Sequence, residues 1–175
     1  MDKPVFFVNM FPDFQPPVDL SQAVICSADV DVESRRIVLQ LHNPTYIPKR
    51  VFEQVAFGLR QHYGLNQVNI IPTFPAQEHV FMEEQEMMDL FVAQDSFARA
   101  TLAGASWVWD EDTLKIGLVA NGKDSLMESV PKVVNAIKEM FGIKINIEIQ
   151  VGNELSGQAL MDAMEQMRAQ MLIHA

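Results

Sequence analysis

Two clusters of acidic residues are the densest groups of chemically capable side chains in this sequence. Four carboxylates lie within residues 83–89, and three more form the run 110–112. Carboxylates that converge from separate strands can hold hydrated Mg²⁺ and support phosphoryl transfer or hydrolysis. The first cluster instead lies at the beginning of a predicted helix, and the second lies in a predicted hairpin turn and is too short for a calcium loop. We interpret both clusters as solvated structural charge and expect no metal site.

The histidines show no pattern of metal ligation or of nucleophilic catalysis. They are far apart and form neither an HxH nor an HxxxH pair: His42, His62, His79 and His174. His42 and His62 can each hydrogen-bond a backbone group, and nothing in the sequence pairs them with a nucleophile. Phosphate-binding motifs of the GxxxxGK[ST] and GxGxxG types are missing as well. We therefore expect no catalytic residue and no cofactor.

A polar loop, Asn121-Gly122-Lys123, precedes a predicted helix and could offer backbone N–H groups to an anion. It lacks the GXXG sequence with which KH modules clamp nucleic acid. We interpret it as the loop that begins the helix, with Asp124 or Ser125 as the capping residue. Asn121, Gly122 and Lys123 are kept as candidate partner-binding residues.

The composition is that of a folded, acidic protein. Of the 175 residues, 49% are hydrophobic and 21% are charged, and the formal net charge is −10. Such a charge repels a phosphate backbone, so it disfavours nucleic-acid binding and favours a basic partner protein. No apolar run approaches the ~20 residues of a transmembrane helix, and the short run 5–8 is followed by prolines, unlike a signal peptide. We expect a cytoplasmic protein whose single cysteine, Cys26, lies in the core.

An internal repeat predicts the elements that must position these residues. An amphipathic stretch ends in aromatic-Gly-aliphatic at Gly64 and again at Gly142, 142 − 64 = 78 residues later, and an apolar strand follows each time. Alternating apolar residues before each stretch predict two strands joined by a turn. The sequence therefore predicts an α+β protein of two β-β-α-β modules. The expected bounds are 23–74 for the first module and 75–175 for the second, which includes a helical insert over 81–103.

The repeat also predicts which strand residues are buried. Trp107 and Trp109 align with Val30 and Val32 at an offset of 107 − 30 = 77. We expect all four on the sheet face that packs against a helix. The alternative for the tryptophans is a surface on which bases stack, and the alignment with valines favours the core.

Residues 1–22 form a lead-in rich in proline and phenylalanine. Prolines at this density are expected to prevent a helix and to favour extended or turn conformations. Phe11 and Phe14 belong to a cluster that is too apolar for a solvated tail. We expect a strap packed across the first module. The alternative is a peptide that docks on another protein through Phe11 and Phe14.

A last helix is predicted over residues 154–172. Met164, Met167 and Met171 follow Leu160 at spacings of four, three and four, which is a narrow seam of the kind that packs on another helix. The seam could cover the second sheet. It could equally dock on a partner or on a further domain of a longer polypeptide.

Several loop and helix-end motifs follow one another in a consistent order through nearly the whole chain. They are Met10-Phe11-Pro12-Asp13, Tyr63-Gly64-Leu65-Asn66, Ala120-Asn121-Gly122-Lys123-Asp124, Phe141-Gly142-Ile143 and Ser156-Gly157-Gln158-Ala159-Leu160. Together they resemble the N-terminal region of the PolC-type DNA polymerase III alpha subunit, the replicative polymerase of low-GC Gram-positive bacteria.

The resemblance implies a non-catalytic region of a DNA-directed DNA polymerase with 3′–5′ exonuclease activity. In that family the region precedes the OB-fold, PHP, exonuclease and polymerase parts, so none of their residues is carried over to this chain. The implied task is docking of replisome proteins such as clamp-loader tau, primase or helicase, and contact with the rest of the polymerase. The second module is similar to KH-like β-β-α-β arrangements. A KH-like module that binds single-stranded nucleic acid is therefore the alternative function.

Overall fold

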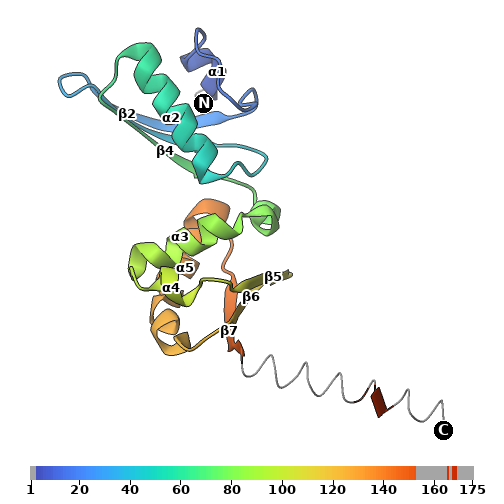
Figure 1. Cartoon of the computed structure of the whole chain (residues 1–175). Helices are drawn as coiled ribbons and strands as arrows, with labels where there is room; N and C mark the ends of the chain where they lie inside the picture. Colours follow the sequence, from blue (N-terminus) through green and yellow to red (C-terminus); the bar gives the residue numbers. More distant parts are fainter. Residues whose placement is uncertain (1–2, 153–164, 166, 169–175) are drawn as a thin grey trace. The chain divides into compact units, whose positions relative to one another are not determined.

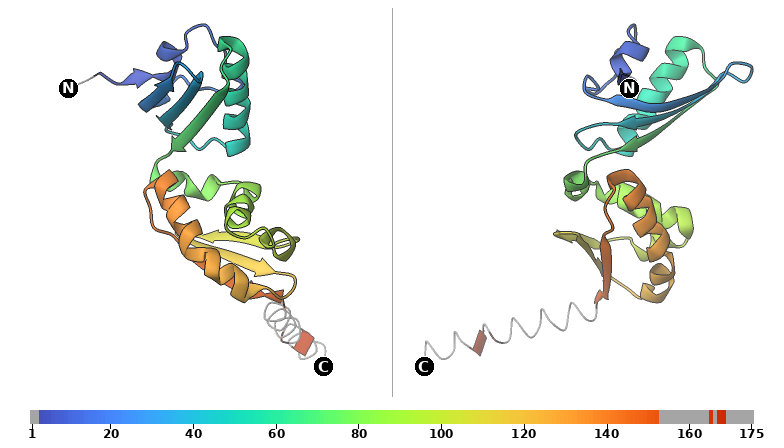
Figure 2. Two further views of the ribbon diagram at one scale, coloured as in Figure 1. Left: turned by 90° about the vertical axis from the view of Figure 1, so that its left-hand side faces the viewer. Right: turned by 180° about the vertical axis from the view of Figure 1, so that it is seen from behind.

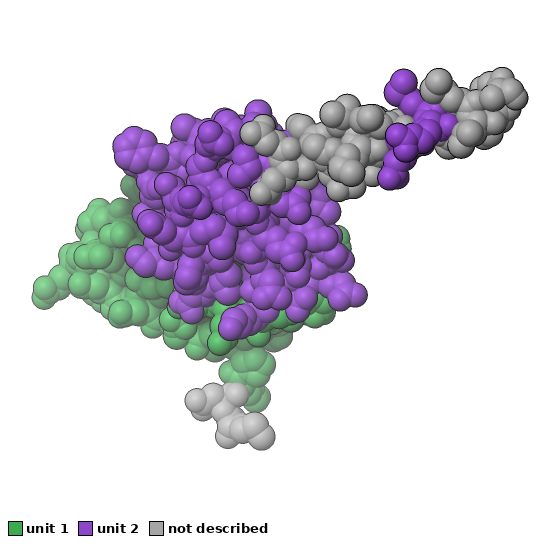
Figure 3. All heavy atoms as spheres, turned by 90° about the horizontal axis from the view of Figure 1, so that it is seen from below, with its two compact units in different colours: residues 1–86, 137–143 green, residues 87–136, 144–175 purple. Residues whose placement is uncertain are grey.

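The computed structural model describes residues 3–152, 165, 167 and 168 (Figure 1). The chain forms two compact units, coloured separately in Figure 3. Unit 1 contains residues 1–86 and 137–143, and unit 2 contains residues 87–136 and 144–175. Each unit is α+β, as predicted, with helices on one face of a small mixed sheet (Figure 2).

Unit 1 is built on a four-stranded sheet of order β1-β2-β3-β4. The strands are β1 (Val5–Phe6), β2 (Val24–Asp31), β3 (Arg36–His42) and β4 (Gln67–Thr73). The first three are antiparallel neighbours, whereas β4 runs parallel to β3. Parallel neighbours require a crossover connection, and the predicted strand-helix-strand order supplies it.

Helix α2 (Lys49–Tyr63) is this crossover, and it covers one face of the sheet (Figure 2). Its buried residues Phe52, Val55 and Leu59 recur at intervals of three and four, the spacing of a single helix face. Gly64 ends the helix with a φ of 65°, in the left-handed region. That helix end was predicted from the sequence, and it is confirmed.

The lead-in packs into unit 1, but the expectation that its prolines prevent a helix was wrong. After β1, residues Phe7–Met10 form the short helix α1, and Phe7 is fully buried. The prolines stand on either side of this turn, at positions 4, 12, 16 and 17. Residues 7–10 therefore keep the backbone N–H groups and the conformational freedom that a helical turn needs.

A helical insert follows β4, as predicted. It contains the 3-10 helix η1 (Ala76–Phe81), α3 (Glu84–Gln94) and α4 (Ala98–Thr101). The boundary between the two units falls within α3, after Glu86. The insert is thus shared by the two units.

Unit 2 repeats the plan of unit 1. It contains β5 (Ser106–Asp110), β6 (Thr113–Leu118), α5 (Lys123–Phe141) and β7 (Asn146–Val151), and the last turns of α5 are counted with unit 1. The sheet order is β5-β6-β7, with an antiparallel hairpin followed by a parallel pair. The duplicated β-β-α-β arrangement is therefore present in both units.

Strands β2 and β5 align differently from the predicted offset. Val30 pairs with Ile37 in unit 1, whereas Trp109 pairs with Leu114 in unit 2. Ile37 and Leu114 are equivalent, so Trp109 is the counterpart of Val30 and not of Val32. The reason lies in the hairpin turn, which joins partners 36 − 31 = 5 residues apart in unit 1 and 113 − 110 = 3 residues apart in unit 2.

The burial predicted for Val30 and Val32 was also wrong. Val30 and Val32 are 50% and 82% exposed, because the β2–β3 hairpin projects past the end of α2 (Figure 1). Trp107 and Trp109 are half-buried. The Trp107 ring lies 6.4 Å from the ring of Phe91, a buried residue of α3.

Cys26 is exposed, contrary to the expectation that it lies in the core. The pairing of β2 with β3 shifts register between Ile25 and Ser27. Cys26 is the extra residue of this β-bulge, and a bulge interrupts the alternation of inward and outward side chains. The apolar neighbours of Cys26 in the sequence therefore do not determine which way it faces.

The last helix predicted over residues 154–172 falls almost wholly outside the described residues. Glu165, Met167 and Arg168 are described, and each is helical. Met164 and Met171 lie outside the described residues.

Candidate protein-docking site

An open groove lies between helix α2 and strand β4 in unit 1. Its volume is about 360 Å³. Its lining comes from two elements: Lys49, Phe52, Glu53 and Ala56 of α2, and residues 68–71 of β4. Phe52 and Val68 are buried and form its floor, whereas Ile71 is 48% exposed at its rim.

Among the described residues, β4 is the last strand of its sheet, so one side of its backbone has no neighbouring strand there. Two hydrogen bonds identify the side that faces β3. The Thr73 carbonyl accepts a hydrogen bond from the Asn43 N–H at 3.1 Å, and the Gln67 N–H donates to the Arg35 carbonyl at 3.3 Å. Because successive backbone groups of a strand point to opposite sides, the odd-numbered residues of β4 face β3.

The even-numbered residues of β4 therefore face the free edge. Val68 and Ile70 present both N–H and C=O there, and Pro72 presents a carbonyl alone. The next outward residue, Phe74, donates its N–H to the Met140 carbonyl at 2.7 Å, a contact within unit 1. The available edge thus extends from Val68 to Pro72, which suits a short extended peptide that adds a strand to the sheet.

Charge is sparse in the groove. Lys49 and Glu53 lie one helical turn apart and carry opposite signs, so their long-range fields largely cancel. The floor beneath them is apolar. An extended segment with apolar side chains fits this lining better than a charged small molecule does.

The candidate contacts Phe11 and Phe14 are packed within unit 1. Phe11 is 6% exposed, and its ring lies 5.6 Å from that of Tyr63. The half-buried Phe14 ring approaches Gly58 of α2 so closely that a Cβ there would lie 2.8 Å from it. The lead-in is therefore a packed strap, and Phe11 has little surface to offer a partner.

The candidate loop Asn121-Gly122-Lys123 contacts helix α4 within unit 2. Gly122 has a φ of 132°, and a Cβ at this position would lie 2.4 Å from Cγ2 of Thr101. Close packing and backbone conformation both require glycine here. Asn121 is exposed and Lys123 half-buried. Their role as partner contacts stays a prediction.

Of the three candidate methionines, Met167 is described and is 62% exposed. Met164 and Met171 lie outside the described residues. The seam that they were predicted to form is therefore not assigned to a surface.

The first acidic cluster is tied into unit 1 by Tyr46. The Tyr46 hydroxyl donates a hydrogen bond to Glu86, accepts one from the Glu83 N–H at 3.2 Å, and lies near the ion pair of Arg50 with Glu83 at 2.8 Å. Burial raises the pKa of Glu86 and, more strongly, that of Tyr46, because desolvation penalises the charged form of each group. The expectation of solvated charge was therefore wrong for Glu86, which is 7% exposed and hydrogen-bonded to Tyr46.

Other candidate functional features are few among the described residues. No three His, Cys, Asp or Glu side chains of the described chain gather as metal ligands. Within the same residues, no helix combines the length and the apolar character that crossing a membrane requires. The His42 ring shares a hydrogen bond of 2.9 Å with the Thr73 hydroxyl, and the His79 ring lies 2.7 Å from the Ala76 carbonyl oxygen.

The α2–β4 groove is not evident from the sequence. Sequence patterns predict the strand through Val68 and Ile70 and the helix stripe through Phe52, but they do not place these elements side by side at an edge. One signal was available, because Pro72 lies within the strand and proline is confined to edge strands, strand beginnings or bulges.

No protein-family model and no curated protein matches this chain.

Proposed function

We propose that this chain is a non-catalytic protein-docking region of a PolC-type replicative DNA polymerase III alpha subunit. Unit 1 binds an extended segment of a replisome protein, which is clamp-loader tau, primase or helicase. The segment lies along β4 in the α2–β4 groove. Polymerase and exonuclease activities belong to the rest of that subunit, and the setting is the cytoplasm.

The observation that carries this proposal is the free edge of β4 beside an apolar groove. A bound segment would pair its main chain with Val68 and Ile70, and alternate side chains would rest on Phe52 and Ala56. In strand addition, main-chain hydrogen bonds provide affinity and side-chain pockets provide specificity. Each such hydrogen bond contributes about 1 kcal/mol net. The apolar contacts must therefore supply much of the remaining free energy of binding.

The charge of the chain supports a protein partner. A net charge of −10 slows the approach of nucleic acid and speeds that of a basic protein. The nearly neutral groove then selects for the apolar side chains of the docked segment.

The binding of purified tau, primase and helicase to the chain tests the proposal. Ala56→Arg places a long side chain across the groove on a helix that tolerates arginine. We expect it to weaken binding by about tenfold or more, which corresponds to about 1.4 kcal/mol.

The matched control is Gln54→Arg, which adds the same charge to an exposed position of α2 outside the groove lining. It should leave binding unchanged, and both variants should unfold near the wild-type temperature. If the wild-type chain binds none of the three proteins, the proposed function fails.

A further inference from the structure

The first turn of helix α2 is held by residues that lie outside the helix. Its N-cap residue is Pro48, which makes no side-chain hydrogen bond, and this described turn contains no acidic residue. A helix N-terminus has unpaired N–H groups and a positive dipole, so it favours a carboxylate. Helix α2 begins instead with two cations, Lys49 and Arg50. Because Lys49 and Phe52 line the α2–β4 groove, the end of the helix that lacks its own cap is also part of the groove wall.

Carboxylates of the helical insert supply the cap that α2 lacks. The Glu86 carboxylate accepts a hydrogen bond from the Lys49 N–H. The Glu83 carboxylate accepts two hydrogen bonds from the Arg50 guanidinium, at 2.8 and 3.1 Å. All of these residues belong to unit 1. The insert therefore stabilises the beginning of α2 from a different part of the chain.

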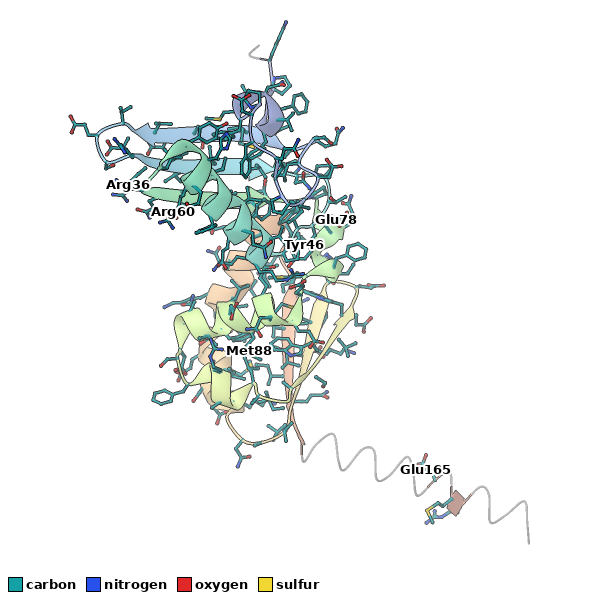
Figure 4. The ribbon with its side chains drawn as sticks, turned by 45° about the horizontal axis from the view of Figure 1, so that its top comes forward. Arg36, Tyr46, Arg60, Glu78, Met88 and Glu165 are labelled. Atoms are coloured by element: carbon teal, nitrogen blue, oxygen red, sulfur yellow. The ribbon has the colours of Figure 1, made fainter. Side chains whose placement is uncertain are left out.

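The same insert holds the connection between β3 and α2. The Tyr46 N–H donates to the Glu78 carboxylate at 3.3 Å, and Figure 4 shows both residues beside the start of α2. The Tyr46 hydroxyl donates to Glu86 and accepts from the Glu83 N–H at 3.2 Å. Glu86 is the buried member of this group, whereas the ion pair of Arg50 with Glu83 lies at the surface, where ion pairs contribute little. Glu86 is therefore the residue on which the contact depends most.

Ring contacts connect Tyr46 to the groove. The centroid of the Tyr46 ring lies 5.4 Å from that of Phe74, and the centroid of Phe74 lies 6.3 Å from that of Phe52. Phe52 is buried in the floor of the groove. Glu86 is thus connected to the groove in two ways, through the backbone of Lys49 and through these rings. Glu86 and Tyr46 themselves are not among the described residues that line it.

We propose that the helical insert is a clamp that controls docking in the α2–β4 groove. While Glu86 binds Tyr46 and the Lys49 N–H, the groove keeps the shape that accepts an extended segment; when these contacts break, the first turn of α2 loosens and the segment dissociates. Glu86 and Tyr46 are positioning residues, because they act through other residues. The inference rests on the proposed function. By linkage, a docked segment must in turn favour the closed clamp.

Ionisation of Glu86 is the step that loosens the clamp. Its carboxyl group faces Tyr46, Lys49 and Glu83, and burial, the largest of the influences on it, raises its pKa. The closed clamp is therefore favoured by protonated Glu86. This contribution is fully present below the ordinary pKa of glutamate and is lost as the pH rises through the raised pKa. Docking should weaken over the same range of pH.

The test uses the whole chain, labelled with ¹⁵N, and purified tau, primase and helicase. Glu86→Ala removes the acceptor of the Lys49 N–H, so the Lys49 amide should exchange about tenfold faster, whereas the amide of Leu59, farther along α2, should keep its rate. Apparent affinity falls in proportion to the fraction of molecules that are competent to bind, so the docked protein should bind about tenfold more weakly. In the wild type, its binding should slow the exchange of the Lys49 amide.

Glu84→Ala is the matched control, because it makes the same change at an exposed position of the same helical turn. It should alter neither the exchange of Lys49 nor the affinity. Glu86→Gln keeps a hydrogen-bond acceptor that does not ionise. It should retain the affinity of the wild type at low pH and remove the loss of affinity at higher pH. If Glu86→Ala also exposes the Leu59 amide, unit 1 has unfolded, and the glutamine variant decides.

Three outcomes would overturn the proposal. They are unchanged exchange of Lys49 in Glu86→Ala, faster exchange with no loss of affinity, and the same pH dependence of affinity in the wild type and Glu86→Gln. Failure of the proposed function gives a different result, because the wild type would then bind none of the three proteins. The exchange of the Lys49 amide would still decide whether the insert holds α2.

Discussion

The Tyr46 hydroxyl donates a hydrogen bond to the buried carboxylate of Glu86, and this contact joins the β3–α2 connection to the first turn of α3 within unit 1. The Tyr46 ring also packs against Phe74 and Phe141, at centroid distances of 5.4 and 6.1 Å. Glu86 is 7% exposed. The contact therefore fixes the beginning of α3 at the cost of desolvating a carboxyl group.

Glu86→Gln should remove a pH dependence of stability. Burial raises the pKa of Glu86, so folding favours the protonated acid. This contribution is fully present below the ordinary pKa of glutamate and is lost as the pH rises through the raised pKa. Glutamine is always neutral and still accepts from Tyr46. We expect the variant to gain stability relative to wild type, measured by urea denaturation, as the pH rises from the ordinary pKa of glutamate through the raised pKa of Glu86. If the free energies of unfolding of the two proteins changed in parallel with pH, the raised pKa of Glu86 would be contradicted.

Tyr46→Phe should destabilise unit 1 by about 1–3 kcal/mol at neutral pH, because it leaves the Glu86 carboxylate without its phenol donor. The ring packing is retained, so the loss reports the two hydrogen bonds of the hydroxyl, the one donated to Glu86 and the one accepted from the Glu83 N–H. The same substitution in the Glu86→Gln background should cost less, since a neutral amide is easier to leave buried. An equal cost in both backgrounds would mean that the carboxylate charge plays no part.

Gly122→Ala should destabilise unit 2 by about 2 kcal/mol or more, because the new methyl group meets Thr101 and the backbone conformation is strained for alanine. Thermal unfolding of the whole chain measures the loss. Gly64→Ala is the comparison, since Gly64 has a φ of 65° and open space around its Cα. It should cost about 1 kcal/mol from strain alone.

The steric part of the Gly122 effect can be isolated with Thr101→Ser, which removes the Cγ2 atom that the new methyl group would meet. Gly122→Ala should cost less in this background than in the wild type. A double-mutant cycle with no coupling would show that α4 does not press on the loop.

Cys26 should react with a thiol reagent in the native protein at the rate of an exposed cysteine, because its side chain lies outside the core at the β2 bulge. Absorbance of the released thiolate from Ellman's reagent measures this rate. If Cys26 reacted only after addition of denaturant, its side chain would be buried in the native protein, and its placement at an exposed bulge would be contradicted.

The order of the elements could be predicted from the sequence, because it depends on local patterns. The Gly64 helix end and the stripe through Phe52, Val55 and Leu59 are properties of short segments, and the structure confirms them. The repeat could be predicted for the same reason. In each unit, the helix that joins the last two strands makes those strands parallel.

The exposure of particular strand residues could not be predicted in the same way. A period of two shows that Val30 and Val32 share a face, but it does not show how far α2 extends over that face. The β2–β3 hairpin is two residues longer than its counterpart, so its end passes beyond the helix. The α2–β4 groove was missed for a related reason, since Val68 and Ile70 acquire a free edge only from the order of the strands.

Amide hydrogen exchange of β4, with and without the bound replisome partner, tests the central claim most directly. In the free chain, Val68 and Ile70 should exchange rapidly because their N–H groups face the open edge, whereas Asn69 and Ile71 should be protected by β3. On binding of tau, primase or helicase, Val68 and Ile70 should become protected as well. A partner that binds tightly while both amides continue to exchange at the rates of the free chain would contradict docking by strand addition.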